Sequence, residues 1–330
     1  MAGNTAFRLG GLALSPEQLP ETQPDGFIQG DGRPTPSYRE QLRRIPNIRN
    51  AISVGSVYVQ TIGVIVLALW LDSRIPAIIV WGSAIILMGR AHAQFASLMH
   101  EAAHRLLFSN KKLNDIVGNW LLGYPAMTST PAYRRVHMAH HRQEFGPEEP
   151  DIPLYANYPV PKASLRRKLF RDATGQTGIK LLSAQMRGLK SADIRVRRTL
   201  WKMISVQVVL LATATALGYP LVYVFFWVLP YLTVWRVINR LRSIAEHGGL
   251  RADSDRRITT HSVHQHLLAR FFLVPFNIGW HLAHHVDAGI PFRNLPAYHR
   301  HLREAGYVTA TIEYPNYRAI WRACASGDAN

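Results

Sequence analysis

The sequence has one cysteine, Cys324, among its 330 residues. A single thiol excludes an intramolecular disulfide framework and any zinc or iron–sulfur site built from cysteines. Gly-rich dinucleotide fingerprints and a haem-binding cytochrome module are also missing. The early residues include no apolar core sufficient for a signal peptide. A metal or redox function would therefore depend on histidine, with or without carboxylates.

Acidic residues are scarce: 21 Asp and Glu stand against 38 Lys and Arg, giving a formal charge of +17. Such a balance favours either nucleic acid or an anionic membrane surface as a partner. The long apolar runs and the position of the charges favour the membrane and argue against nucleic acid. Residues 166–171, with three Arg and one Lys beside Leu and Phe, resemble an interfacial helix on anionic lipid heads.

Four apolar runs predict an all-α membrane protein. The first, 51–71, has no charged residue and is long enough, at roughly 31 Å, to cross a hydrocarbon core. Further spans are expected at about 76–95, 200–217 and 221–238, the last kinked at Pro230. Short connections pair these spans into two hairpins.

Charge predicts the orientation of the hairpins. Arg74 is the only basic residue in the two short connections, so the positive-inside tendency places both termini and all histidine clusters in the cytoplasm. Residues 1–50, rich in proline, are expected to form a disordered cytosolic tail. Residues 51–305 then form the integral membrane domain with a cytosolic helical cap, and 306–330 a cytosolic C-terminal tail.

Histidines recur at helical spacing in three places. His137, His140 and His141 share one helical face, because 3.6 residues per turn brings positions i, i+3 and i+4 together. The range 281–285 repeats this H-x-x-H-H pattern, and 100–104 reads H-E-A-A-H. Neutral imidazole is a common ligand of iron and zinc. The sequence therefore predicts a metal centre made of histidines.

These motifs on four spans resemble the membrane fatty acid desaturase/hydroxylase superfamily, the histidine-box diiron enzymes. The stretch 242–249 resembles the extra histidine segment of that family, and 277–296 its closing block, although 286–289 departs from the usual bacterial acyl desaturase sequence. The resemblance implies two iron ions, O₂ as co-substrate, and nine ligands: His100, His104, His137, His140, His141, His247, His281, His284 and His285. Groups expected to orient these rings are Asn277, Glu101, Glu144, Glu246 and Asp151.

The same resemblance implies a fatty acyl desaturase that introduces a double bond into a long acyl-lipid or acyl-CoA chain. Hydroxylation or ketolation of an acyl chain or of a terpenoid such as a carotenoid is the alternative. Reducing equivalents are expected from a separate ferredoxin or cytochrome. The sequence does not give the regiochemistry, the acyl carrier or the oligomeric state.

Two other metal functions have to be weighed. The range 100–104 also satisfies H-E-x-x-H, the zinc metalloprotease signature, but an intramembrane protease would leave both H-x-x-H-H motifs unexplained. A metal transporter would need polar ligands near the bilayer midplane, whereas the clusters lie beyond the ends of the apolar runs. Imidazole suits both iron and zinc, so iron follows from the family resemblance alone.

Overall fold

The computed structural model describes residues 7–147 and 149–328. The chain divides into two compact units. We call residues 46–134 and 168–239 the membrane unit, and the remaining described residues the histidine unit. Three helices contain a boundary between these units: α5 Thr130–Arg142, α7 Lys162–Ala173 and α12 Val234–His247.

The membrane unit consists of helices and short connections. Its elements are α2 Asn47–Leu71, α3 Ala77–Ala103, α4 Lys111–Ile116, the π-helical segment Val117–Gly123, α8 Gln176–Met186, the 3-10 turn Arg187–Lys190, α9 Ile194–Ala216, α10 Pro220–Tyr223, the π-helical segment Val224–Val228 and α11 Leu229–Leu232. Helix α2 has 25 residues and α3 has 27, so each spans roughly 35–40 Å at 1.5 Å per residue. Both exceed the 30 Å of a typical hydrocarbon core.

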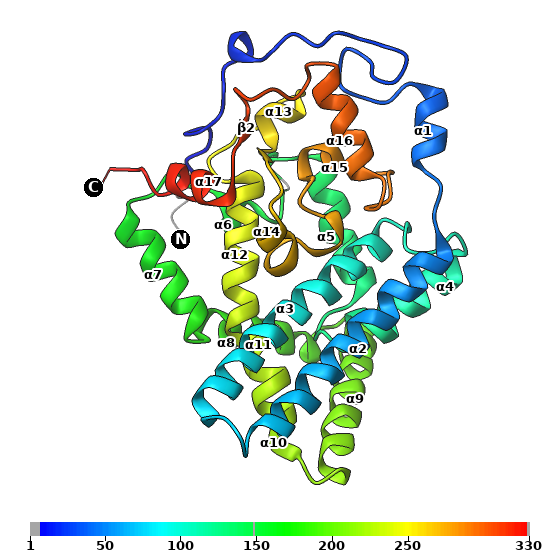
Figure 1. The fold of residues 1–330 in the computed structure, drawn as a ribbon, viewed down its shortest axis with the longest axis vertical. Coiled ribbons are helices and arrows are strands. Elements are labelled where there is room, and N and C mark those ends of the chain that lie inside the picture. The colour runs from blue at the N-terminus through cyan, green and yellow to red at the C-terminus, as the bar shows by residue number, and fades with distance from the viewer. Residues whose placement is uncertain (1–6, 148, 329–330) are drawn as a thin grey trace. The chain divides into compact units, whose positions relative to one another are not determined.

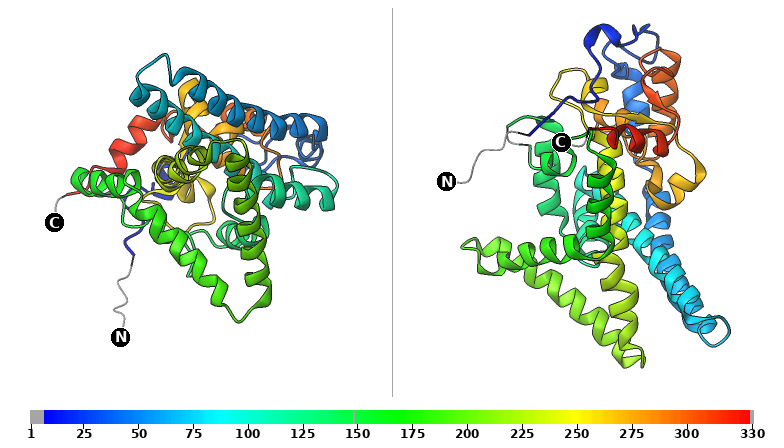
Figure 2. Two further views of the ribbon diagram at one scale, coloured as in Figure 1. Left: turned by 90° about the horizontal axis from the view of Figure 1, so that it is seen from below. Right: turned by 90° about the vertical axis from the view of Figure 1, so that its left-hand side faces the viewer.

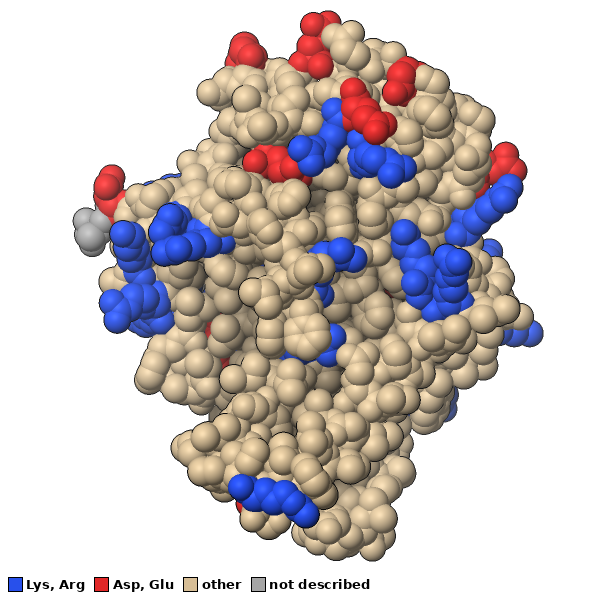
Figure 3. Space-filling view, viewed as in Figure 1, with Lys and Arg blue, Asp and Glu red and all other residues tan. Residues whose placement is uncertain are grey.

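Four helical stretches are long and apolar enough to cross a membrane: Asn47–Leu71, Ala77–Ala103, Ile194–Ala216 and Pro220–His247. Five residues join the first two and three join the last two, so each pair forms a hairpin (Figures 1 and 2). The part of Figure 3 that corresponds to these hairpin turns has very few charged side chains. Each of the four stretches is longer than the apolar run from which it was predicted. The fourth contains the whole of α12 and so continues to His247.

Two polar side chains on α3 inside the membrane unit have hydrogen-bond partners. Arg90 on α3 donates from Nη1 to Oε1 of Gln60 on α2 at 2.8 Å and to Oε1 of Gln94 at 3.1 Å. The ring Nε2 of His92, which is buried, lies 3.0 Å from the carbonyl of Trp227. Charged groups within a span need such partners, because an unsatisfied charge in hydrocarbon is costly.

The fourth span is irregular at its centre, as its proline predicts. Pro230 has no N–H to donate and its ring crowds the carbonyl four residues earlier. The π-helical turn Val224–Val228 ends two residues before Pro230, and Thr233 has the non-helical angles φ −117° and ψ −86°. Helix α12 restarts after this break and ends at His247.

The histidine unit is built from shorter helices. Its elements are the 3-10 turn Pro16–Gln18, α1 Pro36–Leu42, α6 Ile152–Tyr155, α13 Arg256–Thr259, β1 Ser262–Val263, α14 Leu267–Phe272, the 3-10 turn Pro275–Asn277, α15 His281–Val286, α16 Leu295–Glu304, β2 Glu313–Tyr314 and α17 Tyr317–Cys324. Strands β1 and β2 pair in parallel, with Ser262 opposite Glu313. The described residues therefore give a largely helical protein with almost no sheet, and the fold class predicted from the sequence is confirmed.

The N-terminal segment differs from the disordered tail that its prolines predict. Ile28 is fully buried and Leu42 is 5% exposed. Arg39 donates to Asp287 from Nε at 2.5 Å and from Nη2 at 3.3 Å, which joins α1 to the residue after α15. The prolines prevent a long helix, but the few apolar residues between them are sufficient to pack this segment against the histidine unit.

The C-terminal segment is also packed. The indole Nε1 of Trp321 on α17 donates to the carbonyl of Leu241 at 2.8 Å, and the Cys324 thiol lies 3.4 Å from that of Ile244. Gly248 permits this approach, since a Cβ there would lie 3.0 Å from the Cys324 sulfur. Helix α17 thus holds the last turns of α12, which carry His247.

Candidate metal centre

One cluster in the histidine unit joins the end of α12 to helix α15. The Nε2 atoms of His247 and His281 lie 3.0 Å apart, as do those of His281 and His285. All three rings are buried, with 5% exposure or less. His281 and His285 stand at i and i+4 on α15, which brings both rings to the same face of that helix.

Hydrogen bonds on the far side of two rings fix their protonation. Nδ1 of His247 lies 2.9 Å from the carbonyl of Thr259, and Nδ1 of His285 lies 2.5 Å from Oε1 of Glu144. A carbonyl and a carboxylate accept hydrogen bonds, so each Nδ1 carries the proton. The Nε2 atom of each ring is then left with its lone pair, and both lone pairs point towards His281.

The donor atoms of this cluster fit a cation. A single proton on Nε2 of His281 can complete only one of its two 3.0 Å contacts as a hydrogen bond. A positive ion among the three nitrogens would satisfy all three lone pairs. Burial, together with the neighbouring imidazoles, lowers the pKa of His281 and His285 well below the usual range. The rings are therefore neutral, as metal ligation requires.

His140 of helix α5 belongs to the same cluster. One ligand atom of His140 lies within 4.8 Å of those of His247 and His285. Its Nδ1 is 2.9 Å from Oε2 of Glu149 and 3.3 Å from the Tyr155 hydroxyl. Burial opposes protonation, but the hydrogen bond and the charge of Glu149 raise the pKa of His140 above its usual value. A carboxylate behind an imidazole makes that ring a more basic ligand.

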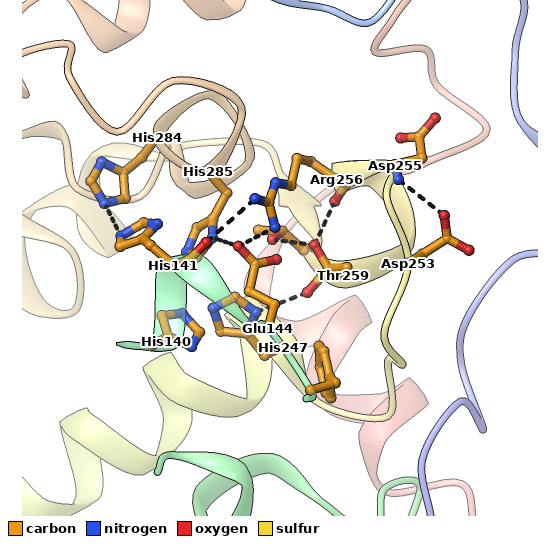
Figure 4. Close-up of polar contacts among 12 residues, drawn as sticks. His140, His141, Glu144, His247, Asp253, Asp255, Arg256, Thr259, His284 and His285 are labelled. Atoms are coloured by element: carbon orange, nitrogen blue, oxygen red, sulfur yellow. Dashed lines mark hydrogen bonds and ion pairs between the residues drawn. The ribbon is translucent and has the colours of Figure 1, made fainter. Parts of the chain in front are cut away.

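A second cluster lies beside the first. Nε2 of His141 is 3.0 Å from Nε2 of both His137 and His284. The rings of His141 and His285 stack with centroids 4.3 Å apart, so the two clusters are adjacent (Figure 4). Because one nitrogen cannot complete two such contacts with one proton, this cluster also fits a cation. Two neighbouring clusters suit a pair of ions.

Seven of the nine histidines expected as ligands thus come together in the histidine unit. The other two, His100 and His104, lie in the membrane unit at the end of α3, with ring centroids 4.7 Å apart. His100 is buried, with 1% exposure. The spacing i, i+4 places both rings on one face of the helix end.

The groups expected to orient the ligands have different positions. Glu144 lies between His285 and Arg256, whose Nη1 is 2.7 Å from Glu144 Oε1 (Figure 4). Glu246 accepts from Arg242 at 2.6 Å and lies 3.5 Å from Nδ1 of His281.

The other three candidates have different surroundings. Asp151 groups with His140 and Glu149 within 4.8 Å, and burial raises the pKa of its carboxyl group. Asn277 instead accepts a hydrogen bond from Arg270 at 3.3 Å, and Glu101 is buried on α3.

Several contacts of the cluster are not evident from the sequence. Glu149, Thr259 and Arg256 contact ligand rings or their partners, and each lies outside the histidine motifs. Glu149 follows His140 by nine residues, and residues 143–147 between them are not helical, so no helical periodicity connects them. Acidic residues close to a histidine motif are the only sequence signal that points to such partners.

Comparison with known proteins agrees with this geometry. The family model for fatty acid desaturases matches residues 76–316. Dihydrorhizobitoxine desaturase from Bradyrhizobium elkanii is 25% identical over 269 residues, which cover 77% of this chain and 76% of that protein. The matched range includes both histidine clusters and the end of α3. The chain is a membrane oxidoreductase of the diiron desaturase type and belongs to the fatty acid desaturase family.

Proposed function

We propose that this protein is an O₂-dependent desaturase that introduces a double bond into a long fatty acyl chain, carried as an acyl-lipid or acyl-CoA. The observation that supports this most strongly is the convergence of two Nε2 clusters in one unit. Family membership implies a lipid substrate. The related protein from Bradyrhizobium elkanii is named for a desaturation, which favours this reaction over hydroxylation or ketolation.

The proposed ligands are the nine histidines of the three motifs and of α12. His140, His247, His281 and His285 would hold one iron ion. His137, His141 and His284 would contribute to the other, and His100 and His104 complete the set. Bound iron would activate O₂, the oxidant, so that hydrogen can be removed from an unactivated C–H bond.

The groups that contact Nδ1 of the ligand rings would orient those rings. Glu144, Glu149 and the Thr259 carbonyl keep the proton of each ring on Nδ1, so that Nε2 faces the ions. Burial of the rings of His140, His247 and His285, each 3% exposed, limits the access of water, which would otherwise compete for the metal.

We further propose that the termini and the active site face the cytoplasm and that a separate ferredoxin or cytochrome supplies electrons. The turn between α2 and α3 contains one arginine, and that between α9 and α10 contains no basic residue. A reporter fused to the C-terminus tests the orientation. Fluorescence of a fused green fluorescent protein supports it, whereas activity of a fused periplasmic phosphatase contradicts it.

Lipid profiling of a host that lacks other desaturases tests the reaction. Cells that express the chain with a ferredoxin and its reductase should accumulate lipids two hydrogen atoms lighter than the substrate. A His140→Ala variant should abolish that product. A product one oxygen atom heavier would show hydroxylation, and unchanged lipids in an iron-loaded strain would refute both reactions.

Metal analysis tests the ligand set separately. Protein purified anaerobically with ferrous iron should hold about two irons per chain, and His285→Ala should lose iron. His264→Ala is the matched control, because His264 is exposed and outside both clusters. Equal iron content in the two variants would contradict the assignment. A single zinc with peptide cleavage would revive the metalloprotease interpretation of 100–104.

A further inference from the structure

A cavity of about 920 Å³ lies in the histidine unit, next to both clusters. His141 and His285 form part of its lining, together with the arginines Arg33, Arg39, Arg43, Arg44 and Arg256. If it were a sphere, the cavity would be about 12 Å across, within the size range of small-molecule sites. A ligand in this cavity would therefore lie close to the proposed irons.

The charge of this cavity is positive. Five arginines stand against two carboxylates, Glu40 and Asp287, which leaves an excess of three positive charges. Four of the five arginines come from the segment 33–44, which precedes the range matched by the family model. The basic lining is therefore a contribution of the packed N-terminal segment.

Three of these arginines are already engaged. Arg39 is paired with Asp287 and Arg256 with Glu144, while Arg33 lies 3.5 Å from Asp31. Among the described residues, Arg43 and Arg44 have no carboxylate within ion-pair distance, and both are exposed. Their guanidinium groups are available to an incoming anion, and guanidinium matches carboxylate and phosphate geometry with two parallel hydrogen bonds.

We propose that this cavity binds the anionic head group of the substrate, a carboxylate or a phosphate, chiefly through Arg43 and Arg44. This proposal rests on the proposed function and adds where the charged end of the acyl substrate binds. A head group held within about 12 Å of His141 and His285 makes the protein count carbons from that end. The position of the new double bond should then stay fixed relative to the charged group when the chain is lengthened at its methyl end.

The concave shape of this cavity favours a small anion over a protein as its ligand. An acidic electron donor would meet a broad complementary surface, whereas these arginines surround a recess whose wall includes two of the proposed ligands. Asp287 and Glu144 are used to hold Arg39 and Arg256 in that wall. The positive charges of Arg43 and Arg44 remain available to a ligand in the cavity.

Binding of octyl phosphate, octanoate and neutral octanol to the iron-loaded protein in zwitterionic nanodiscs tests this proposal. Wild type should bind both anions more tightly than octanol, with an affinity that falls as salt is raised. The double variant R43Q/R44Q should lose about tenfold or more in affinity for the anions. The matched control R318Q/R322Q removes two exposed arginines of α17, outside the cavity, and should bind them as wild type does.

The outcomes separate this proposal from the proposed function. Tighter binding of octyl phosphate indicates a phosphorylated carrier or lipid, and tighter binding of octanoate a free acid. Octanol binding equal to that of the anions, or undiminished anion binding in R43Q/R44Q, overturns the proposal even if the enzyme desaturates. A variant that changes only the KM for the electron donor also overturns it and indicates protein docking. If R43Q/R44Q fails to fold, the wild type alone decides: anion binding that does not weaken as salt is raised overturns the proposal.

Discussion

Replacing Glu144 with Gln isolates the effect of one carboxylate on one proposed ligand. Oε1 of Glu144 accepts from Nδ1 of His285 at 2.5 Å and from Arg256 at 2.7 Å, and the side chain is 1% exposed. Glutamine has nearly the same shape and still offers an oxygen to Nδ1–H. The substitution removes the negative charge and replaces one carboxylate oxygen with an amide NH₂, while the contact that positions His285 can be kept.

The expected loss can be worked from these contacts. A hydrogen bond to a charged group contributes about 1.5–3 kcal/mol and a neutral one about 0.5–1.5 kcal/mol, so each contact weakens by roughly 1–1.5 kcal/mol. Oε2 of Glu144 is buried with no hydrogen-bond partner, and an amide NH₂ placed there adds a further unsatisfied donor. Carboxylates behind metal-binding histidines typically account for about 10–100-fold in affinity. We expect Glu144→Gln to lower iron affinity within that range.

Competition with a chromogenic ferrous chelator, under anaerobic conditions, measures this loss. Glu304→Gln is the matched control, because Glu304 lies 2.9 Å from Nδ1 of His301 but is 54% exposed and outside the clusters. The control should bind iron as wild type does. If Glu144→Gln also retains wild-type affinity and melting temperature, the carboxylate has no influence on a ligand, and the role given to His285 is refuted.

Three further outcomes follow from other parts of the chain. A side chain at Gly89 of α3 would overlap Val234, so Gly89→Leu should destabilise the membrane unit by about 1–3 kcal/mol, seen as a lower melting temperature in detergent. Burial alone would raise the pKa of Asp255, but hydrogen bonds and charge from Arg257 hold it below its usual value. Its contribution is therefore complete above the unfolded-state pKa of about 3.9 and is lost as pH falls through the lowered value, so the stability difference between wild type and Asp255→Asn should shrink in acid. Burial raises the pKa of Cys324 to about 12, so maleimide should label it only after unfolding, and rapid labelling of the folded protein would contradict the packing of α17.

The sequence predicts well where the long helices lie and which histidines share a helical face, because both depend on local periodicity. A run of 21 uncharged residues and the spacing i, i+3, i+4 each have one common structural meaning. The kink at Pro230 follows in the same way from the chemistry of a single residue. These features required no knowledge of contacts between distant parts of the chain.

The partners of the histidines could not be predicted in this way, because they come from loops and from the ends of short helices. Thr259 contributes a backbone carbonyl, which any residue type at that position would provide. Glu149 contacts His140 from outside helix α5, and Arg256 contacts Glu144 from a helix of four residues. Tertiary packing alone brings such groups together, so neither periodicity nor residue type identifies them.

The N-terminal segment shows why composition can mislead about order. Its prolines and glycines disfavour a long helix, but disorder also requires that too little apolar surface be buried to offset the lost chain entropy. Ile28, Tyr38 and Leu42 supply that surface, and the Arg39–Asp287 pair fixes the segment to the end of α15. The arginines of this segment, Arg43 and Arg44 directly after Leu42 among them, thereby line the same cavity as His141 and His285. In the proposed head-group site, a segment outside the matched family range would therefore fix the distance between the charged end of a substrate and the new double bond.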